Sequence, residues 1–341
     1  MNLKTIPVLY NPVGQAPRVD LVKEIPLSRP LSVYIEPCNS CNFKCLFCPE
    51  SFADYKEKSG GMYMLSLDDF KKIAFQVKEV APVRLINFYM LGEPFINKHL
   101  TTFIRLAKEM GLAETVIVTT NGSLVRPDKY RAICDSGLDF LRVSIYGGTE
   151  ELHRKRTQSQ FPLSKIRDNI AGLKEFRDTE GYESPFIYAK MITASVKEGA
   201  AFAALFGPHT DKLQVESAAH NWMELPDKNL AQLDDAEMFS QKYFSNRKEV
   251  CPFPFYMSII HSDLNVSVCG VDWAKLAVVG NLRNETLAEV WRGPRLREFQ
   301  LKHLQRKRCE LAACANCTYI HTATDNIDAL DEKAIDRRHN K

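Results

Sequence analysis

The amino-acid sequence predicts an α/β protein, a partial (β/α)6 barrel followed by a small cysteine-rich α+β domain. Six strand-like segments alternate with helix-like segments between residues 31 and 216, and this alternation stops near residue 225. The cysteines fall into two groups with an almost cysteine-free middle. Regular β/α alternation implies a parallel sheet covered by helices. Because six units are too few for a closed eight-stranded barrel, an open, curved partial barrel is expected.

Hydrophobic periodicity sets the predicted elements of the barrel. Residues 83–91 form a near-continuous apolar run, as expected for a strand buried on both faces, whereas residues 67–80 carry apolar side chains at helical spacing. The predicted strands are 31–36, 83–91, 115–119, 140–145, 186–192 and 212–216. The predicted helices are 67–80, 99–110, 127–136, 163–177 and 198–206.

The pattern after residue 225 differs from the barrel. A polar connector covers residues 226–249, and short strands are predicted at 256–261, 265–268 and 277–279, with helices at 286–291 and 294–304. We therefore place a boundary near residue 245. The predicted division is an extended arm over 1–30, the barrel over 31–245, the cysteine-rich domain over 246–322 and a polar, mostly surface-exposed tail over 323–341.

Composition narrows the classes of protein. The 341 residues include 45 basic and 42 acidic side chains, and this near-balance gives no reason to expect nucleic acid or an anionic membrane as partner. The N-terminus lacks a secretory signal, and no apolar stretch is long enough to span a membrane. We expect a cytoplasmic protein, in which ten cysteines indicate metal or redox chemistry rather than disulfides.

One cysteine motif carries chemistry directly. Cys41, Cys45 and Cys48 have the spacing C-x3-C-x2-C and follow a predicted strand. Three thiolates suit an iron–sulfur cluster that leaves one iron without a protein ligand, able to chelate a small molecule. A structural zinc site normally has four protein ligands. Cys38 could be the fourth, so a zinc-binding scaffold that holds a partner stays an open alternative on spacing alone.

The region around this motif resembles the radical S-adenosylmethionine (SAM) superfamily. The segment Tyr34–Pro37 and the cysteine loop resemble that family's first strand and loop, and the resemblance covers about residues 31–220. It implies a four-iron cluster on Cys41, Cys45 and Cys48 with SAM on the open iron. It also implies reductive cleavage to a 5′-deoxyadenosyl radical, with an electron from a reductant such as flavodoxin or ferredoxin.

The same resemblance assigns SAM contacts at the carboxyl ends of strands, where ligands of parallel sheets gather. Gly92, Glu93 and Pro94 would meet the SAM ammonium, for which a carboxylate is suited. Asn121 would line the same face and Ser144 would contact the ribose. Arg156 would pair with the SAM carboxylate through its planar guanidinium, and Arg154 is its competitor.

The C-terminal cysteines resemble SPASM or twitch domains, which hold auxiliary iron–sulfur clusters. They are Cys251, Cys269, Cys309, Cys314 and Cys317, too few for two fully ligated clusters. The resemblance implies one auxiliary four-iron cluster, for which we predict Cys251, Cys269, Cys314 and Cys317 as ligands. Cys309 could replace one of these four or be a free thiol.

Two radical outcomes stay open at the level of the sequence. An auxiliary cluster that accepts an electron leads to oxidation, as inferred for the family's alcohol dehydrogenases on aminocyclitols. A thiol that returns a hydrogen atom to the other face leads to epimerisation. The candidate hydrogen donors are Cys38 and Cys309, whereas Cys134 is discounted because it lies on a predicted outer helix.

The substrate is expected to be a small polar molecule such as a sugar, an aminocyclitol or an amino-acid derivative. Only about thirty residues precede the first strand, too few for a leader-peptide-binding domain. Modification of a peptide or protein is the alternative. The predicted substrate contacts are Glu216, His220 and Trp222, with Asn221 beside them and with His261 and Asp272 as weaker candidates.

Overall fold

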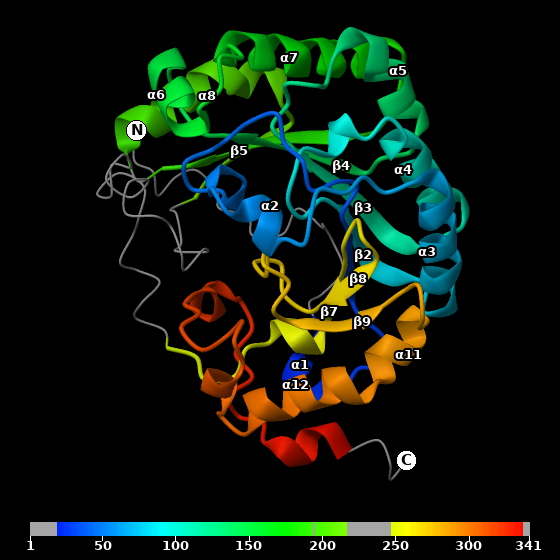
Figure 1. Cartoon of the computed structure of the whole chain (residues 1–341). Coiled ribbons are helices and arrows are strands. Elements are labelled where there is room, and N and C mark those ends of the chain that lie inside the picture. The colour runs from blue at the N-terminus through cyan, green and yellow to red at the C-terminus, as the bar shows by residue number, and fades with distance from the viewer. Residues whose placement is uncertain (1–18, 194, 217–246, 337–341) are drawn as a thin grey trace.

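A computed structural model describes residues 19–193, 195–216 and 247–336 of the chain. Its centre is one nine-stranded sheet with the order β6-β5-β4-β3-β2-β1-β7-β8-β9 (Figure 1). The strands are β1 (Ser32–Ile35), β2 (Val83–Phe88), β3 (Ala113–Thr120), β4 (Phe140–Ile145), β5 (Phe186–Ile192), β6 (Lys212–Glu216), β7 (Met257–Ile260), β8 (Asn265–Ser267) and β9 (Val278–Asn281).

Strands β1 to β6 form the predicted parallel half of the sheet. Each pairs in parallel with the next along the chain, and helices cover the outer side (Figure 1). These helices are α3 (Leu67–Glu79), α4 (Leu100–Glu109), α5 (Pro127–Asp135), α7 (Leu163–Thr179) and α8 (Val196–Phe206). The prediction of an open (β/α)6 barrel is confirmed, and the predicted elements differ from the observed ones by only a few residues at their ends.

Aromatic and aliphatic side chains fill the space between the sheet and its outer helices. Phe70 of α3 stacks on Phe103 of α4 with ring centroids 4.3 Å apart, and Phe88 of β2 packs 5.7 Å from Phe70. Along β4, fully buried residues alternate with half-buried ones. Since side chains alternate across a strand, the half-buried Arg142 and Ser144 share the opposite, concave face of the sheet. The site described below lies on that face.

The cysteine-rich domain joins the same sheet rather than forming one of its own. Strand β7 pairs in parallel with β1 over Ser32–Ile35, and β8 and β9 continue antiparallel. Its helices α11 (Leu287–Arg292) and α12 (Pro294–Leu304) belong to the same hydrophobic core as the barrel. The two parts therefore hold each other in place through backbone ladders and shared apolar burial. The predicted boundary near residue 245 lies outside the described residues.

Three short helices were not predicted from the sequence: α1 (Leu21–Glu24), α2 (Tyr55–Lys58) and α6 (Glu150–Thr157). Helix α1 lies in the predicted extended arm. Helix α6 begins at Thr149, whose hydroxyl accepts a hydrogen bond from the Leu152 N–H at 3.3 Å. This N-cap, together with acidic residues in the first turn, is the local signal that favours a helix there.

The tail after residue 322 was predicted to be polar and mostly exposed, and its polar side chains are largely exposed, but its apolar side chains pack inward. Ile327, Leu330, Ala334 and Ile335 are buried in a small core that also contains Leu21 and Leu304. The Arg306 guanidinium donates to the Leu330 carbonyl at 2.8 Å and so holds the tail on α12. The apolar residues of this tail are separated by charged ones. They therefore form no apolar run in the sequence that would have predicted their burial.

Candidate active site

The three cysteines of the first motif lie in the loop after β1. The loop is held against α6 by hydrogen bonds from the Lys44 N–H to the Thr157 carbonyl, at 3.1 Å, and from the Leu46 N–H to the Arg156 carbonyl, at 2.9 Å. Cys41, Cys45 and Cys48 all line one cavity on the concave face of the sheet. The cavity measures about 520 Å³, enough for a cofactor and a small molecule together.

The thiols fit a group that supplies positive charge. Burial raises the pKa of Cys48 to about 12, and it raises the pKa values of Cys41 and Cys45 as well. Negative charge on Cys41 and Cys48 raises the pKa of Cys45 further, so the three sulfurs lie within each other's field. Without a metal these thiols would stay protonated, and a bound iron–sulfur cluster would stabilise their thiolate forms because ligation and deprotonation are coupled.

Within residues 19–193, 195–216 and 247–336, no three or more Cys, His, Asp or Glu side chains are arranged to hold a single metal ion.

Cys38 has a different role from the other three. Its thiol donates to the Glu93 carbonyl at 3.3 Å and to the Ser40 carbonyl at 3.5 Å, and it does not line the cavity. It therefore connects the cysteine loop to the loop after β2. The prediction that Cys38 supplies a hydrogen atom to the substrate is untested, and the structure places its thiol behind the cavity wall.

Gly92 is required at the point where these two loops touch. Its φ is +74°, and a Cβ atom there would lie 2.5 Å from the Cys38 carbonyl oxygen and 2.7 Å from the Ser40 carbonyl oxygen. Only glycine combines that backbone conformation with so close an approach. The contact places Glu93, whose N–H donates to the Ser40 carbonyl at 2.9 Å, beside the cysteine loop.

Glu93 is a buried carboxylate at the rim of the cavity. It accepts hydrogen bonds from the Thr120 hydroxyl at 2.7 Å, the Asn121 N–H at 2.8 Å and the Phe95 N–H at 3.1 Å. Burial outweighs these donors and raises its pKa above the ordinary value. An ammonium group bound beside it would favour the ionised form. Pro94 lies outside the cavity wall, where it begins the short 3-10 helix Pro94–Ile96.

Asn121 and Ser144 follow Glu93 along the carboxyl ends of β3 and β4. Both line the cavity, as does Gly92. The Asn121 side chain donates to the Asn42 side-chain oxygen at 2.9 Å, so it also meets the cysteine loop. The structure thus brings together the cysteine motif and four of the six residues that the sequence analysis assigned to SAM.

Arg156 is placed elsewhere. It is 3% exposed and forms a two-pronged ion pair with Glu198 of α8, including a hydrogen bond between Nη2 and Oε2 at 3.2 Å. Its Nη1 also donates to the Tyr146 carbonyl at 3.3 Å. It does not line the cavity, and its competitor Arg154 is exposed on α6. Arg156 lies away from the cavity because its side of α6 faces Glu198 on α8. Its contact with the SAM carboxylate stays a prediction.

The C-terminal cysteines converge near the other end of the cavity. Burial is the largest cause of the raised pKa values of Cys251, Cys269 and Cys314, and charge on neighbouring cysteines of the set, Cys317 among them, adds to it. Gly270 and Val271, next to Cys269, line the cavity. Cys309 is exposed. The four residues predicted as ligands thus lie within one another's electrostatic reach.

The loop around Cys314 and Cys317 is closed by Arg308. Its Nη1 donates to the Cys314 carbonyl at 2.7 Å and to the Cys317 carbonyl at 3.1 Å. The buried His303 lies with Nε2 3.6 Å from the Cys314 sulfur, and burial lowers the pKa of this imidazole to about 4. These contacts hold the backbone at both cysteines and place an imidazole beside the Cys314 sulfur.

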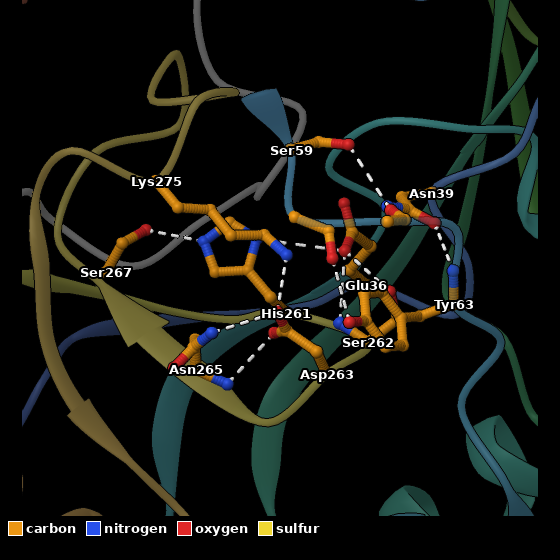
Figure 2. Close-up of polar contacts among 12 residues, drawn as sticks. Glu36, Asn39, Ser59, Tyr63, His261, Ser262, Asp263, Asn265, Ser267 and Lys275 are labelled. Atoms are coloured by element: carbon orange, nitrogen blue, oxygen red, sulfur yellow. Dashed lines mark hydrogen bonds and ion pairs between the residues drawn. The ribbon is translucent and has the colours of Figure 1, made fainter. Parts of the chain in front are cut away.

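A buried polar junction around Glu36 joins the end of β1 and the loop after β2 to the turn after β7 (Figure 2). Glu36, directly after β1, accepts on one oxygen from the Leu91 N–H at 3.3 Å, next to Gly92. Its other oxygen accepts from the Ser262 N–H at 3.0 Å and the Ser262 hydroxyl at 2.9 Å, in the turn after β7. Burial raises the pKa of Glu36, but His261 and Ser262 lower it more, so the net shift is downward.

The two residues named as weaker candidates for substrate contacts, His261 and Asp272, have structural partners in and near this junction. His261 is buried, contacts the Ser267 hydroxyl through Nε2 at 2.8 Å and has Nδ1 3.7 Å from the Glu36 carboxylate. The Asp272 carboxylate accepts from the backbone N–H groups of Leu276 and Ala277. Neither residue lines the cavity, so both serve the junction and its neighbouring turn in this structure.

The cavity has a polar wall that sequence reasoning found only in part. The predicted Glu216 lines it and pairs with Lys190 of β5, and it accepts from Gln214 at 2.5 Å. His220, Asn221 and Trp222 lie outside the described residues. The residues that the prediction missed are Tyr34, Tyr89, Arg142, Tyr188 and Lys190. Period-2 alternation along β4 was the available signal, since it puts Arg142 on the face of Ser144.

Comparison with known proteins assigns the chain to a class. Residues 35–179 match the model of the radical SAM superfamily, and residues 251–318 match SPASM, an iron–sulfur cluster-binding domain. The chain belongs to the radical SAM superfamily and carries a C-terminal SPASM domain. Its cofactors are accordingly a SAM-binding four-iron cluster, SAM itself and auxiliary iron–sulfur ligation in the SPASM domain. This assignment takes the place of the zinc-scaffold alternative.

Individual relatives are distant. The chain is 21% identical over 295 residues to the S-adenosyl-L-methionine-dependent 2-deoxy-scyllo-inosamine dehydrogenase of Niallia circulans, covering 86% of this chain and 94% of the dehydrogenase. It is 29% identical over 153 residues to a GTP 3′,8-cyclase of Aquifex aeolicus, covering 44% of this chain and 46% of the cyclase. The chain thus spans less than half the length of that second relative.

Solved structures share the fold at low identity. BtrN in complex with AdoMet and 2-DOIA matches with a TM-score of 0.54 and 16% identity, over 87% of this chain and 94% of BtrN. SuiB of Streptococcus suis, bound to the precursor peptide SuiA, matches with a TM-score of 0.57 and 14% identity, over 92% of this chain and 77% of SuiB.

Proposed function

We propose that this radical SAM enzyme oxidises a small polar substrate at a C–H bond, by loss of one hydrogen atom, one electron and one proton. The supporting observation is one continuous cavity, whose lining includes Cys41, Cys45 and Cys48 as well as Gly270 and Val271 beside Cys269. When bound, SAM on its cluster supplies the radical that takes the hydrogen atom, and the auxiliary cluster accepts the electron. A substrate in this cavity lies between the two.

The proposed ligands follow from the site. Cys41, Cys45 and Cys48 would hold the SAM cluster, and Cys251, Cys269, Cys314 and Cys317 would hold one auxiliary four-iron cluster. Glu93 and Asn121 would bind and orient the SAM amino-acid end, and Ser144 would hold the ribose. The separately placed Cys309 is exposed and would be a free thiol. The domain division at about residue 245 belongs to this proposal.

Oxidation is favoured over epimerisation by the positions of the spare cysteines. The Cys38 thiol donates to backbone carbonyls, Cys134 is buried in the core on α5, and Cys309 is exposed. Each thiol is thus placed away from the cavity wall. An epimerase of the proposed kind needs a thiol beside the substrate radical. The similarity to a dehydrogenase over most of the chain points in the same direction.

Peptide modification is the second candidate. It is favoured by the similarity to SuiB bound to its precursor peptide and, over 118 residues at 27% identity, to a PqqA peptide cyclase of Rhodopseudomonas palustris. The charged lining of Arg142, Lys190 and Glu216 supports a small polar molecule instead.

Among the described residues, no helix is long and apolar enough to cross a bilayer. A cytoplasmic location and a flavodoxin or ferredoxin reductant stay part of the proposal.

The test uses anaerobically reconstituted protein with dithionite and SAM. We expect about eight irons per chain, four for each cluster, and release of 5′-deoxyadenosine. Cys45→Ala should abolish that release, whereas Cys134→Ala should leave it unchanged as a matched control. Release of 5′-deoxyadenosine by Cys45→Ala, or an iron count of about four in the wild type, would contradict the cluster assignment.

The reaction type needs a separate measurement. A substrate that stimulates 5′-deoxyadenosine release should yield a product lighter by two hydrogen atoms, with deuterium from the substrate carbon in the 5′-deoxyadenosine. A product whose mass is unchanged in ordinary water, but which gains one deuterium when the reaction is run in D2O, would instead indicate epimerisation. Stimulation by a peptide, with no response to small polar molecules, would favour the second candidate.

A further inference from the structure

The cavity wall contains a half-buried arginine, Arg142, that forms no ion pair with a carboxylate of the described residues. Arg142 of β4 lines the cavity, and its Nε atom is buried without a hydrogen-bond partner. Its guanidinium carbon lies 4.8 Å from the centre of the Tyr89 ring. The groups that influence its charge most strongly are Tyr89, Tyr188 and Tyr34, so among the described residues no acid is prominent beside it.

Four other arginine and lysine side chains of the described residues, all largely buried, are paired with a carboxylate. Arg156 has Glu198, Arg177 has Asp211, Lys190 has Glu216 and Lys275 has Asp263. These pairs follow the general rule that buried charge is matched by opposite charge, because transfer of a lone ion from water is costly. Arg142 departs from that rule at the one place where a ligand can supply the missing charge.

The surroundings of Arg142 already favour negative charge. Tyr34 packs edge-on against Tyr89 with ring centroids 5.4 Å apart, so the phenols form a rigid wall next to the guanidinium. Burial alone would raise the pKa of Tyr89, yet Arg142 and Lys190 bring it below the ordinary value. The same field acts on any ligand group that enters this part of the cavity.

The position of Arg142 separates it from the expected SAM contacts. It pairs in register with Thr119 of β3 and Tyr188 of β5, two residues before Ser144 along β4. At about 3.3 Å per residue it lies roughly 6.6 Å deeper in the barrel than Ser144. The residues that would hold SAM, among them Glu93, Asn121 and Ser144, follow or end their strands at the rim of the cavity. The deeper position is left for the substrate.

We propose that Arg142 binds an anionic group of the substrate, a carboxylate or a phosphate, and that the substrate is therefore an acidic small molecule. This proposal rests on the proposed function and narrows it to sugar acids, sugar phosphates and acidic amino-acid derivatives. The planar guanidinium fork of Arg142 lines the cavity and fits either group with two hydrogen bonds from N–H groups that face the ligand.

The experiment measures binding to the reconstituted holoenzyme loaded with SAM, at low ionic strength and by anaerobic calorimetry. The first probe is inorganic phosphate. We expect binding by the wild type and a loss of about tenfold or more in Arg142→Gln, the factor expected from one strong charged hydrogen bond. Arg131→Gln, an exposed arginine paired with Glu180 outside the cavity, should bind phosphate like the wild type.

The second probes are glucose, glucosamine, glucuronate and glucose 6-phosphate. Tighter binding of glucuronate and glucose 6-phosphate than of glucose and glucosamine supports the proposal. Whichever of the two acids binds more tightly identifies the preferred group as carboxylate or phosphate. Arg142→Lys keeps the charge without the fork and should bind at an intermediate level. Iron content and circular dichroism of each variant show whether it has folded.

Three results would overturn the proposal: no phosphate binding by the wild type, equal binding by Arg142→Gln, or a loss of SAM affinity in that variant with phosphate binding retained. The last result would assign Arg142 to the SAM carboxylate. SAM affinity is measured from the change in the electron paramagnetic resonance signal of the cluster when SAM is added. Release of 5′-deoxyadenosine without any anion tests the proposed function separately, so either idea can fail alone.

Discussion

Gly92→Ala tests whether the close contact between the cysteine loop and the loop after β2 holds the SAM site together. The added Cβ would lie 2.5 Å from the Cys38 carbonyl oxygen and 2.8 Å from the Ser40 nitrogen, and both are backbone atoms that cannot rotate away. The residue would also keep its φ of +74°. One of the two loops must therefore move.

The expected magnitude has two parts. A side chain in the left-handed region costs about 1–2 kcal/mol, and forced overpacking costs about 1–3 kcal/mol more. The sum predicts a loss of about 2–5 kcal/mol in the free energy of unfolding. Because Glu93 follows Gly92 directly, we also expect SAM to bind at least about tenfold more weakly, equivalent to ~1.4 kcal/mol.

The matched control is Gly181→Ala. Gly181 has nearly the same φ, +76°, but a Cβ there meets nothing within 4 Å. It should show the backbone part alone, with unchanged SAM affinity. Urea unfolding of both variants and titration of SAM against the cluster's electron paramagnetic resonance signal provide the comparison. If Gly92→Ala costs no more than Gly181→Ala, the argument from the loop contact is wrong.

Three further predictions concern charge and metal content. Glu198→Ala should lower the free energy of unfolding by about 3–5 kcal/mol, because it leaves the Arg156 guanidinium buried without its carboxylate. Wild-type stability should fall as the pH drops below 4.5, the ordinary value for Glu36, since its lowered pKa contributes stability above that pH and loses it as the carboxylate protonates. Cys314→Ser should lower the iron count by about four per chain, whereas Cys309→Ser should leave it unchanged.

Each of these has a direct check. The double variant Arg156→Met with Glu198→Leu should recover most of the stability lost in Glu198→Ala, as apolar replacements of buried ion pairs often do, and no recovery would mean that the loss has another cause. Glu36→Gln should show a flatter dependence of unfolding free energy on pH below 4.5, and a parallel curve would remove Glu36 as its source. Equal iron loss in both cysteine variants would place Cys309 among the ligands.

The parts of the site that could be predicted are those encoded by local sequence. The cysteine spacing, the glycine before Glu93 and the strand-ending positions of Asn121 and Ser144 each depend on a few adjacent residues. Parallel strands bring their carboxyl ends to one edge, so the topology alone gathers these positions around a common cavity. The structure places all of these positions at the cavity, whereas Pro94 and Arg156, which were assigned to the same site, do not line it.

Arg156 and Arg142 show where this reasoning reaches its limit. An arginine after β4 matches a family pattern, but whether it faces the cavity depends on the short helix α6 and on Glu198, which lies 42 residues further along the chain. Arg142 attracts no attention in the sequence because strand residues of either polarity are common. Its importance comes from what surrounds it, three tyrosines and no prominent acid among the described residues.

By itself, the sequence determined the α/β alternation, the two cysteine groups and the superfamily, because hydrophobic period and motif spacing are properties of neighbouring residues. Only the tertiary structure decided that β7 joins β1 in one sheet, that Glu36 bridges Leu91 and Ser262, and that Arg142 faces the cavity. These contacts join residues up to 226 positions apart. No local pattern specifies them, because they arise only when the whole chain has packed.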